Sequence, residues 1–150
     1  MLHNIRSVHN VGSIFRTADA AGVTKIILVG YTPTPLDRFG RARKDFAKVS
    51  LGAENTVVWE QVETFAEAVT KVKEAGCTVV ALEQDAASVP LFEYKTPTKN
   101  IALVLGSEVE GILKSELALC DAVVEIPMHG TKESLNVSVA AGIALFSLLK

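Results

Sequence analysis

The stretch IPMHGTKESLNVSVAAG, residues 126–142, decides how the rest of this sequence is interpreted. An apolar run ends in a loop that carries Gly130, and from Ser134 the chain continues to Leu149 without a charged residue. This order predicts a strand, a loop and a final helix. Ser134 and Asn136 would stand in the first turn of that helix, where a buried amide needs hydrogen-bond partners. The residues leave two interpretations open: either the pair caps the helix, with Ser134 as the N-cap, or it contacts a bound molecule.

Composition limits the class of protein. The chain has 150 residues, of which 49% are hydrophobic and 21% are charged. That is enough for one well-filled core and too little for two ordinary domains, so we expect a single domain over residues 1–150. No apolar run approaches the ~20 residues of a membrane span, and the first ten residues lack the apolar core of a signal peptide.

The cysteines and the net charge indicate the cellular compartment and the class of binding partner. Cys77 and Cys120 lie far apart in the sequence and show no metal-ligand spacing, so we expect buried thiols in the reducing cytoplasm and no metal. The formal net charge of −2 argues against an overall basic nucleic-acid binder, but it leaves room for a local basic patch.

Helical spacing alternates with short apolar runs through most of the chain. Asn10 is expected to cap a helix that stops at Gly22, and further helices are expected over residues 62–76 and 107–120. Strands are expected at residues 25–30, 55–60, 77–83, 100–106 and 122–127. Strands that are apolar throughout are typical of a sheet covered on both sides. The alternation therefore predicts an α/β fold with a mainly parallel sheet flanked by helices.

The segment from Tyr31 to Ser50 interrupts this alternation, because its two prolines are incompatible with regular structure. It contains the one basic cluster of the sequence, in which Phe39 stands among cationic residues: Arg38, Arg41, Arg43, Lys44 and Lys48. Such a cluster is either a solvated face or a loop that contacts phosphates. An aromatic ring that can stack on a base slightly favours an RNA-binding surface.

Ligands of such folds bind at the carboxyl ends of strands, so the loops after Glu83, Gly106 and Pro127 are the expected ligand loops. The loop GSEVEG that starts at Gly106 matches neither the dinucleotide fingerprint nor a P-loop. Glu108 and Glu110 would repel a phosphate and favour an unphosphorylated ligand, including a cationic one. The alternative is that both acids only complement the dipole of the helix expected to follow.

Three segments, NVGSIFRTA (10–18), LVLGSEVEGI (103–112) and IPMHGTKESLNVSVAAGIAL (126–145), bear on function. In order and spacing they resemble the three signature motifs of the SpoU/TrmH family of RNA ribose 2′-O-methyltransferases, within the SPOUT superfamily. The resemblance covers nearly the whole chain, and the third segment is the most specific. It implies S-adenosylmethionine as methyl donor, tRNA or rRNA as substrate, a C-terminal trefoil knot that holds the donor, and a homodimer with active sites near the subunit interface.

The resemblance also implies roles for single residues. The donor pocket would be lined by the backbone around five positions: Leu82, Gly106, Ile126, Met128 and Leu135. The motifs imply catalytic roles for Arg16, Ser134 and Asn136, and substrate contacts for Asn10 and Glu108. Val109 departs from the pattern, because many relatives have glycine there.

A guanidinium is effectively always protonated, so Arg16 is expected to hold a phosphate and to stabilise negative charge on the 2′ oxygen. Because the sequence lacks the additional N-terminal RNA-binding domain of some relatives, RNA recognition is expected from the dimer surface or a partner, with Arg38, Arg41 and Arg43 as contacts. The alternative function is a non-catalytic RNA-binding or assembly protein with the same fold. A doubly wound nucleotide-binding enzyme is disfavoured, since both phosphate fingerprints are absent.

Overall fold

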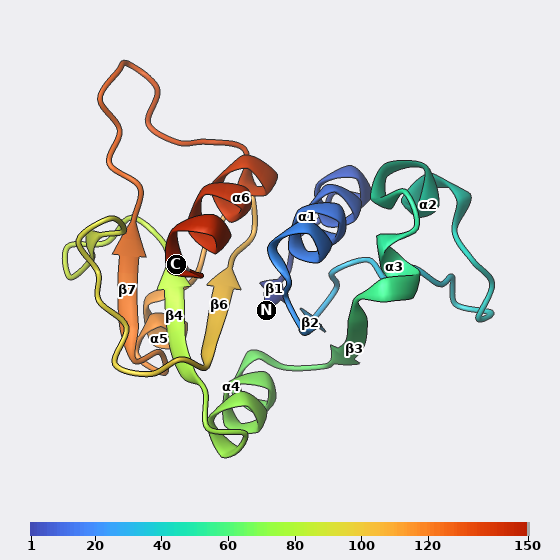
Figure 1. Cartoon of the computed structure of the whole chain (residues 1–150), viewed down its shortest axis with the longest axis horizontal. Coiled ribbons are helices and arrows are strands. Elements are labelled where there is room, and N and C mark those ends of the chain that lie inside the picture. The colour runs from blue at the N-terminus through green and yellow to red at the C-terminus, as the bar shows by residue number, and fades with distance from the viewer. Residues whose placement is uncertain (150) are drawn as a thin grey trace.

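A single seven-stranded sheet forms the centre of the computed structural model, which describes residues 1–149 (Figure 1). Every strand pair in it is parallel, so the predicted mainly parallel sheet is confirmed. The spatial order is β3-β2-β1-β6-β4-β7-β5. The strands are β1 (Leu2–His3), β2 (Lys25–Val29), β3 (Val58–Val62), β4 (Thr78–Leu82), β5 (Val89–Pro90), β6 (Ile101–Leu105) and β7 (Ala122–Glu125).

Helices cover both faces of the sheet. They are α1 (Val8–Ala21), α2 (Lys44–Ser50), α3 (Ala53–Thr56), α4 (Phe65–Glu74), α5 (Lys114–Leu117) and α6 (Val137–Leu148). Successive residues of a strand point to opposite faces. In β2, Ile26 and Leu28 accordingly join a core cluster with α1, α2 and α6, whereas Ile27 and Val29 join a second cluster with α4 and α5. In Figure 1, α1 and α6 lie side by side over the same face.

The first helix begins earlier than expected. Its N-cap is Ser7, whose side chain accepts a hydrogen bond from the amide of Asn10, so the expectation that Asn10 caps the helix was wrong. Asn10 is buried within α1 instead. Gly22 ends the helix at φ 75°, in the left-handed conformation predicted for it.

The helix expected over residues 107–120 is mostly absent. The Ser107 hydroxyl accepts hydrogen bonds from the amides of Val109 and Glu110, both at 3.3 Å, and Gly111 closes the turn at φ 65°. A serine side chain that bonds nearby amides competes with helix formation, and only α5 is helical. Glu108 and Glu110 therefore do not complement the dipole of a helix that follows them.

Two further expectations need correction. Residues 44–50 of the expected irregular segment form α2, because Phe46 is buried against the Phe15 ring of α1, with ring centroids 5.1 Å apart. Cys77 and Cys120 are free thiols, as expected, but each is half-buried rather than buried. Burial still raises the pKa of the Cys120 thiol to about 11.

Strand register brings the ligand loops together. Leu82 of β4 pairs with Leu105 of β6 and with Val124 of β7, so three neighbouring strands end at the same edge of the sheet. The loops that follow these strands meet there. Within residues 1–149, no helix has both the length and the apolar character required to cross a membrane.

Candidate functional site

A cavity of about 580 Å³ lies at this carboxyl edge, between the loops that follow β4, β6 and β7. Its volume falls within the roughly 300–1,000 Å³ typical of small-molecule sites. All five residues that the resemblance implied for a donor pocket line it: Leu82, Gly106, Ile126, Met128 and Leu135. Ser134, Asn136 and Glu108 line it as well. The structure thus brings residues of the second and third motifs to one cavity.

Close backbone packing shapes the middle loop of this cavity. A Cβ atom added to Gly106 would lie 2.6 Å from the carbonyl carbon of Gly111 and 2.6 Å from Cγ1 of Ile112, so no larger residue fits without a shift. The carboxylate of Glu83, at the end of β4, accepts a hydrogen bond of 2.9 Å from the Ile112 amide. Gln84 donates from Nε2 to the carbonyl of Glu133, at 2.6 Å. These contacts connect the three loops around the cavity.

A chain of side-chain hydrogen bonds joins the three motifs. Asn136 donates from Nδ2 to Oδ1 of Asn10 at 3.1 Å, and Asn10 donates from Nδ2 to Oε1 of Glu108 at 3.1 Å. Glu108 also accepts from the backbone amides of Arg6 and Ser7, at 3.0 and 3.2 Å. Asn10 and Glu108 thus hold neighbouring elements together.

The hydrogen bonds that Glu108 accepts explain its ionisation. Burial opposes the charged form, but hydrogen bonds from the amide of Arg6, its own amide, the Asn10 side chain and the amide of Ser7 together lower its pKa below the usual value. Two of these donors, the amides of Arg6 and Ser7, lie directly before α1. The negative charge of Glu108 therefore lies at the positive end of the dipole of that helix.

The polar pair before α6 divides into two roles. Asn136 is the N-cap, since its Oδ1 accepts a hydrogen bond of 2.8 Å from the amide of Ser138. Ser134 precedes the helix and is exposed at the cavity, so the interpretation of Ser134 as the N-cap was wrong. Asn136 therefore caps the helix and also lines the cavity, whereas Ser134 lines the cavity without capping the helix.

Arg16 is the implied site residue that lies apart from the others. It is exposed on α1, off the buried face, as expected, and it does not line the cavity. The chain therefore does not bring Arg16 to the residues with which it was grouped.

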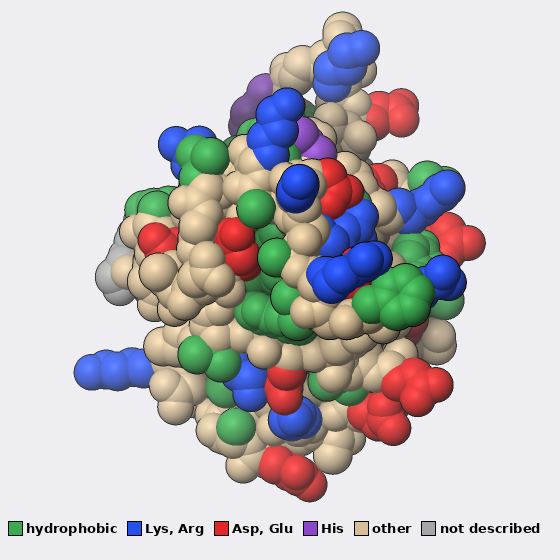
Figure 2. Space-filling model, turned by 90° about the vertical axis from the view of Figure 1, so that its right-hand side faces the viewer, with side chains coloured by type: hydrophobic (Ala, Val, Ile, Leu, Met, Phe, Trp, Pro, Cys, Tyr) green, Lys and Arg blue, Asp and Glu red, His purple; other side chains and the backbone are tan. Residues whose placement is uncertain are grey.

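The basic cluster lies on the loop between β2 and α2 and extends into α2, which contains Lys44 and Lys48. Arg41 pairs with Asp37 at 2.8 Å, and Arg43 pairs with Asp45 at 2.8 Å. The ring of Phe39 is 67% exposed and lies 4.8 Å from the guanidinium of Arg38 and 5.0 Å from that of Arg41. Figure 2 faces this side of the molecule and shows Lys and Arg side chains gathered beside exposed hydrophobic ones. The cluster is an exposed basic surface in which two guanidinium groups lie over an exposed aromatic ring.

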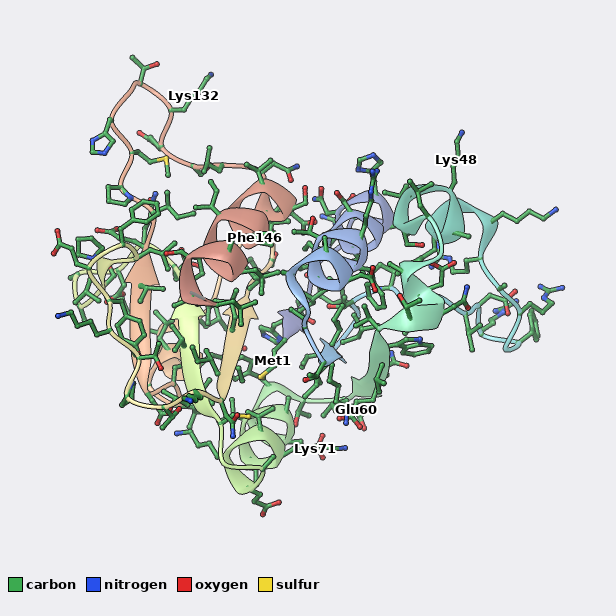
Figure 3. All side chains as sticks on the ribbon, in the orientation of Figure 1. Met1, Lys48, Glu60, Lys71, Lys132 and Phe146 are labelled. Atoms are coloured by element: carbon green, nitrogen blue, oxygen red, sulfur yellow. The ribbon has the colours of Figure 1, made fainter. Side chains whose placement is uncertain are left out.

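Gly130, in the loop between β7 and α6, has open space around it. A Cβ atom there would meet nothing within 4 Å. The loop between β7 and α6 rises away from the body of the protein, with Lys132 near its tip (Figures 1 and 3). Val109, where many relatives have glycine, is 77% exposed and does not require a positive φ, so the valine fits its loop.

Charge distinguishes the cavity from a phosphate site. No Lys, Arg or His is among its lining residues. Four carboxylates line it: Glu83, Glu108, Glu110 and Glu125. This agrees with the preference for an unphosphorylated or cationic ligand. Sequence reasoning missed Glu83, Gln84 and Ser7 as organising residues. The available signal was a polar pair directly after a buried strand, in the case of Glu83 and Gln84.

Comparison with protein families and with curated proteins gives consistent matches. Residues 1–146 match the SpoU rRNA Methylase family. The 23S rRNA (guanosine-2′-O-)-methyltransferase RlmB of Ralstonia nicotianae is 37% identical over 100% of this chain, which covers 57% of that relative. The protein of the same name from Escherichia coli is 35% identical over 100% of this chain and 58% of its own length. The chain thus spans little more than half the length of these relatives.

Solved structures agree with these matches. An AdoMet-bound rRNA methyltransferase from Sinorhizobium meliloti superimposes with a TM-score of 0.84 at 34% identity, covering 98% of this chain and 53% of that one. A TrmH/SpoU tRNA modifying enzyme from A. aeolicus gives a TM-score of 0.82 at 28% identity, covering 99% of this chain and 71% of that one.

Proposed function

The chain belongs to the SpoU rRNA methylase family, and on that premise we propose that it transfers a methyl group from S-adenosylmethionine to a ribose 2′-hydroxyl of rRNA or tRNA. The observation that carries this proposal is the cavity at the carboxyl edge, where loops of the second and third motifs meet and Asn10 of the first is bonded to both. The relatives named for 23S rRNA support an rRNA substrate.

The cavity fits the donor chemically. Apolar side chains of Leu82, Ile126, Met128 and Leu135 provide walls for a purine ring and an alkyl chain, and four carboxylates provide negative charge. When bound, S-adenosylmethionine supplies the methyl group as a positively charged sulfonium. An acidic cavity without a lining cation favours such a ligand over a nucleotide carrying phosphates.

The protein's part in the reaction is alignment and charge stabilisation. In-line displacement requires the 2′ oxygen to be held on the axis of the bond that breaks, and the hydroxyl must lose its proton to phosphate or water. We assign Ser134 and Asn136 to orienting the ribose or the donor, and Arg16 to the phosphate and the developing negative charge. Because Arg16 does not line the cavity of its own chain, its contact requires RNA that extends across α1 or a second subunit.

Donor binding and turnover test the proposal separately. Calorimetry with S-adenosylmethionine should give saturable one-site binding. Incubation with labelled donor and unmodified transcripts of 23S rRNA and tRNA, followed by digestion to nucleosides, should give a 2′-O-methylated nucleoside. Donor binding without transfer to any transcript would leave the non-catalytic RNA-binding alternative, and lack of donor binding would refute the site itself.

A homodimer accompanies this proposal. Helix α6 buries only Ala141 and Ala144, whereas Val139, Phe146 and Leu149 are 51%, 57% and 51% exposed. Figure 3 shows Phe146 on the outer side of this helix. An apolar helix face of this kind is expected to pack against a second copy that presents the same face.

Residues 1–150 form one methyltransferase domain, supported by core clusters on both faces of one sheet. The C-terminal segment forms a trefoil knot, as the resemblance of residues 126–145 to the third family motif implies. An experimental chain trace that reduces to an unknotted line would refute the knot. The protein works in the cytoplasm, which suits its two free cysteines.

A further inference from the structure

A second groove adjoins the donor cavity on the same edge of the sheet. Arg6, Val8, Tyr31, Pro33 and Arg43 line it, and it shares the Ser107–Glu110 loop with the donor cavity. The groove lies where β1 and β2 end, and β1 is the neighbour of β6 in the sheet. The two spaces are therefore adjacent, with the loop after β6 as their common wall.

Tyr31 is exposed in this groove on a rigid support. Its side chain is 57% exposed, yet its backbone amide donates a hydrogen bond of 3.2 Å to Oδ1 of Asn4. Gly30 before it has φ 66°, and a Cβ there would overlap that Asn4 oxygen. Thr32 after it is buried and bonds the Leu2 carbonyl at 2.9 Å and the Ile5 amide at 3.1 Å. An exposed aromatic residue between two such anchors is pre-ordered for stacking.

Two arginines belong to the same groove. The backbone amide of Arg6 is bonded to Glu108, which fixes the start of its side chain beside the donor cavity. The guanidinium of Arg43 donates hydrogen bonds from Nε and Nη2 to the carboxylate of Asp45, at 3.1 and 2.8 Å. A guanidinium has five N–H donors, so Arg43 keeps others free for a phosphate while Asp45 orients it.

We propose that this groove is the acceptor subsite: Tyr31 stacks on the base of an unpaired nucleotide, and Arg6 and Arg43 hold the phosphates beside it. This rests on the proposed methyl transfer and specifies its substrate class. The ribose would then lie at the Ser107–Glu110 loop, next to the donor cavity. A base within a helix has both faces covered by its neighbours, so only a nucleotide in a loop, a bulge or a single strand can stack on Tyr31.

The first test is kinetic. Single-turnover transfer to the 23S rRNA or tRNA transcript that the protein methylates should fall about tenfold to a hundredfold in Tyr31→Ala, the range of base–aromatic stacking. Tyr31→Phe should recover most of this loss, since it keeps the ring. Donor affinity by calorimetry should not change in either variant. Phe92→Ala is the matched control, because Phe92 is 61% exposed and lines neither cavity.

The second test maps contact and does not require turnover. Transcripts carrying 4-thiouridine, irradiated with the wild-type protein and S-adenosylhomocysteine, should crosslink to the peptide that contains Tyr31, and a fully paired duplex of the same sequence should not. Transfer by Tyr31→Ala equal to that of Phe92→Ala, or crosslinks confined to other peptides, would overturn the subsite while leaving the methyltransferase intact. A wild-type protein that neither binds the donor nor methylates RNA would instead overturn the proposed function.

Discussion

At the scale of single residues, Gly106 controls the shape of the donor cavity. Gly106→Ala should cost about 1–3 kcal/mol of stability through overpacking, because the new Cβ would meet the Gly111 backbone and Ile112 at 2.6 Å. Donor affinity should fall with it, since the loop must move. Gly130→Ala is the control, because a Cβ there meets nothing within 4 Å. Calorimetry and thermal melting of both variants check this, and wild-type donor affinity in Gly106→Ala would contradict it.

Arg16 separates catalysis from donor binding. If its guanidinium stabilises charge that appears only in the transition state, Arg16→Ala should lose transfer rate by roughly a hundredfold to a thousandfold. Its donor affinity and melting temperature should stay near wild type, because Arg16 is exposed and lies outside the cavity. Arg16→Lys should rescue poorly, since an ammonium lacks the planar two-pronged contact. Near wild-type transfer by Arg16→Ala would move the catalytic role to Ser134 and Asn136.

At the scale of elements, Glu108 links the loop after β6 to the N-terminus of α1. Hydrogen bonds hold its pKa in the folded protein below the ordinary value of 4.5, so its contribution to stability is complete above that pH. The contribution is lost as the pH falls through the lowered folded pKa.

Glu108→Gln should therefore melt at a lower temperature than wild type near neutral pH, and the difference should shrink as the solution is acidified below pH 4.5. Glu110→Gln is the control, because it removes a charge from the same loop and leaves the hydrogen bonds between Asn136, Asn10 and Glu108 in place. Melting curves between neutral and acid pH measure this. A difference that does not change with pH would mean that the carboxylate does not stabilise α1 through its charge.

At the scale of the whole molecule, the exposed face of α6 is the predicted dimer interface. Phe146→Glu combined with Val139→Glu should give a monomer, because two buried charges would face their symmetry copies. Val58→Glu is the control, because Val58 is 60% exposed on the edge strand β3, and this variant should leave the dimer intact. Light scattering at micromolar concentration measures the oligomeric state of each protein. A wild-type protein that is monomeric under these conditions would refute the predicted interface.

The basic surface should bind RNA through phosphates and stacking. Arg38→Ala combined with Arg41→Ala should weaken RNA binding and flatten its dependence on salt, since fewer counterions are released. Donor affinity should not change. Lys71→Ala is the control, because Lys71 pairs with Glu60 on another part of the surface (Figure 3). RNA affinity and salt slope equal to wild type in the double variant would identify the cluster as a solvated face.

The sequence by itself determined five of the seven strands, the parallel sheet and the identity of the ligand loops. It missed β1 and β5, because a strand of two residues is too short to show a pattern. Strands buried on both sides must be apolar throughout, and that pattern is local, as in the KIILV run of β2. Most of the helix expected after Gly106 does not form, and the reason is again local, although its signal in the sequence is weaker. The Ser107 side chain bonds the nearby amides, and Gly111 is left-handed, and these two features outweigh the helical spacing.

Only the tertiary structure decided what the motif residues do. Asn10 bonds Glu108 across 98 residues and Asn136 across 126, so neither its burial nor its partners follow from neighbouring sequence. The same holds for Arg16, whose place outside the cavity depends on how α1 packs beside α6. Hydrogen bonds and packing between distant segments form only when the sheet brings its strand ends together, and that step sets the geometry of the site.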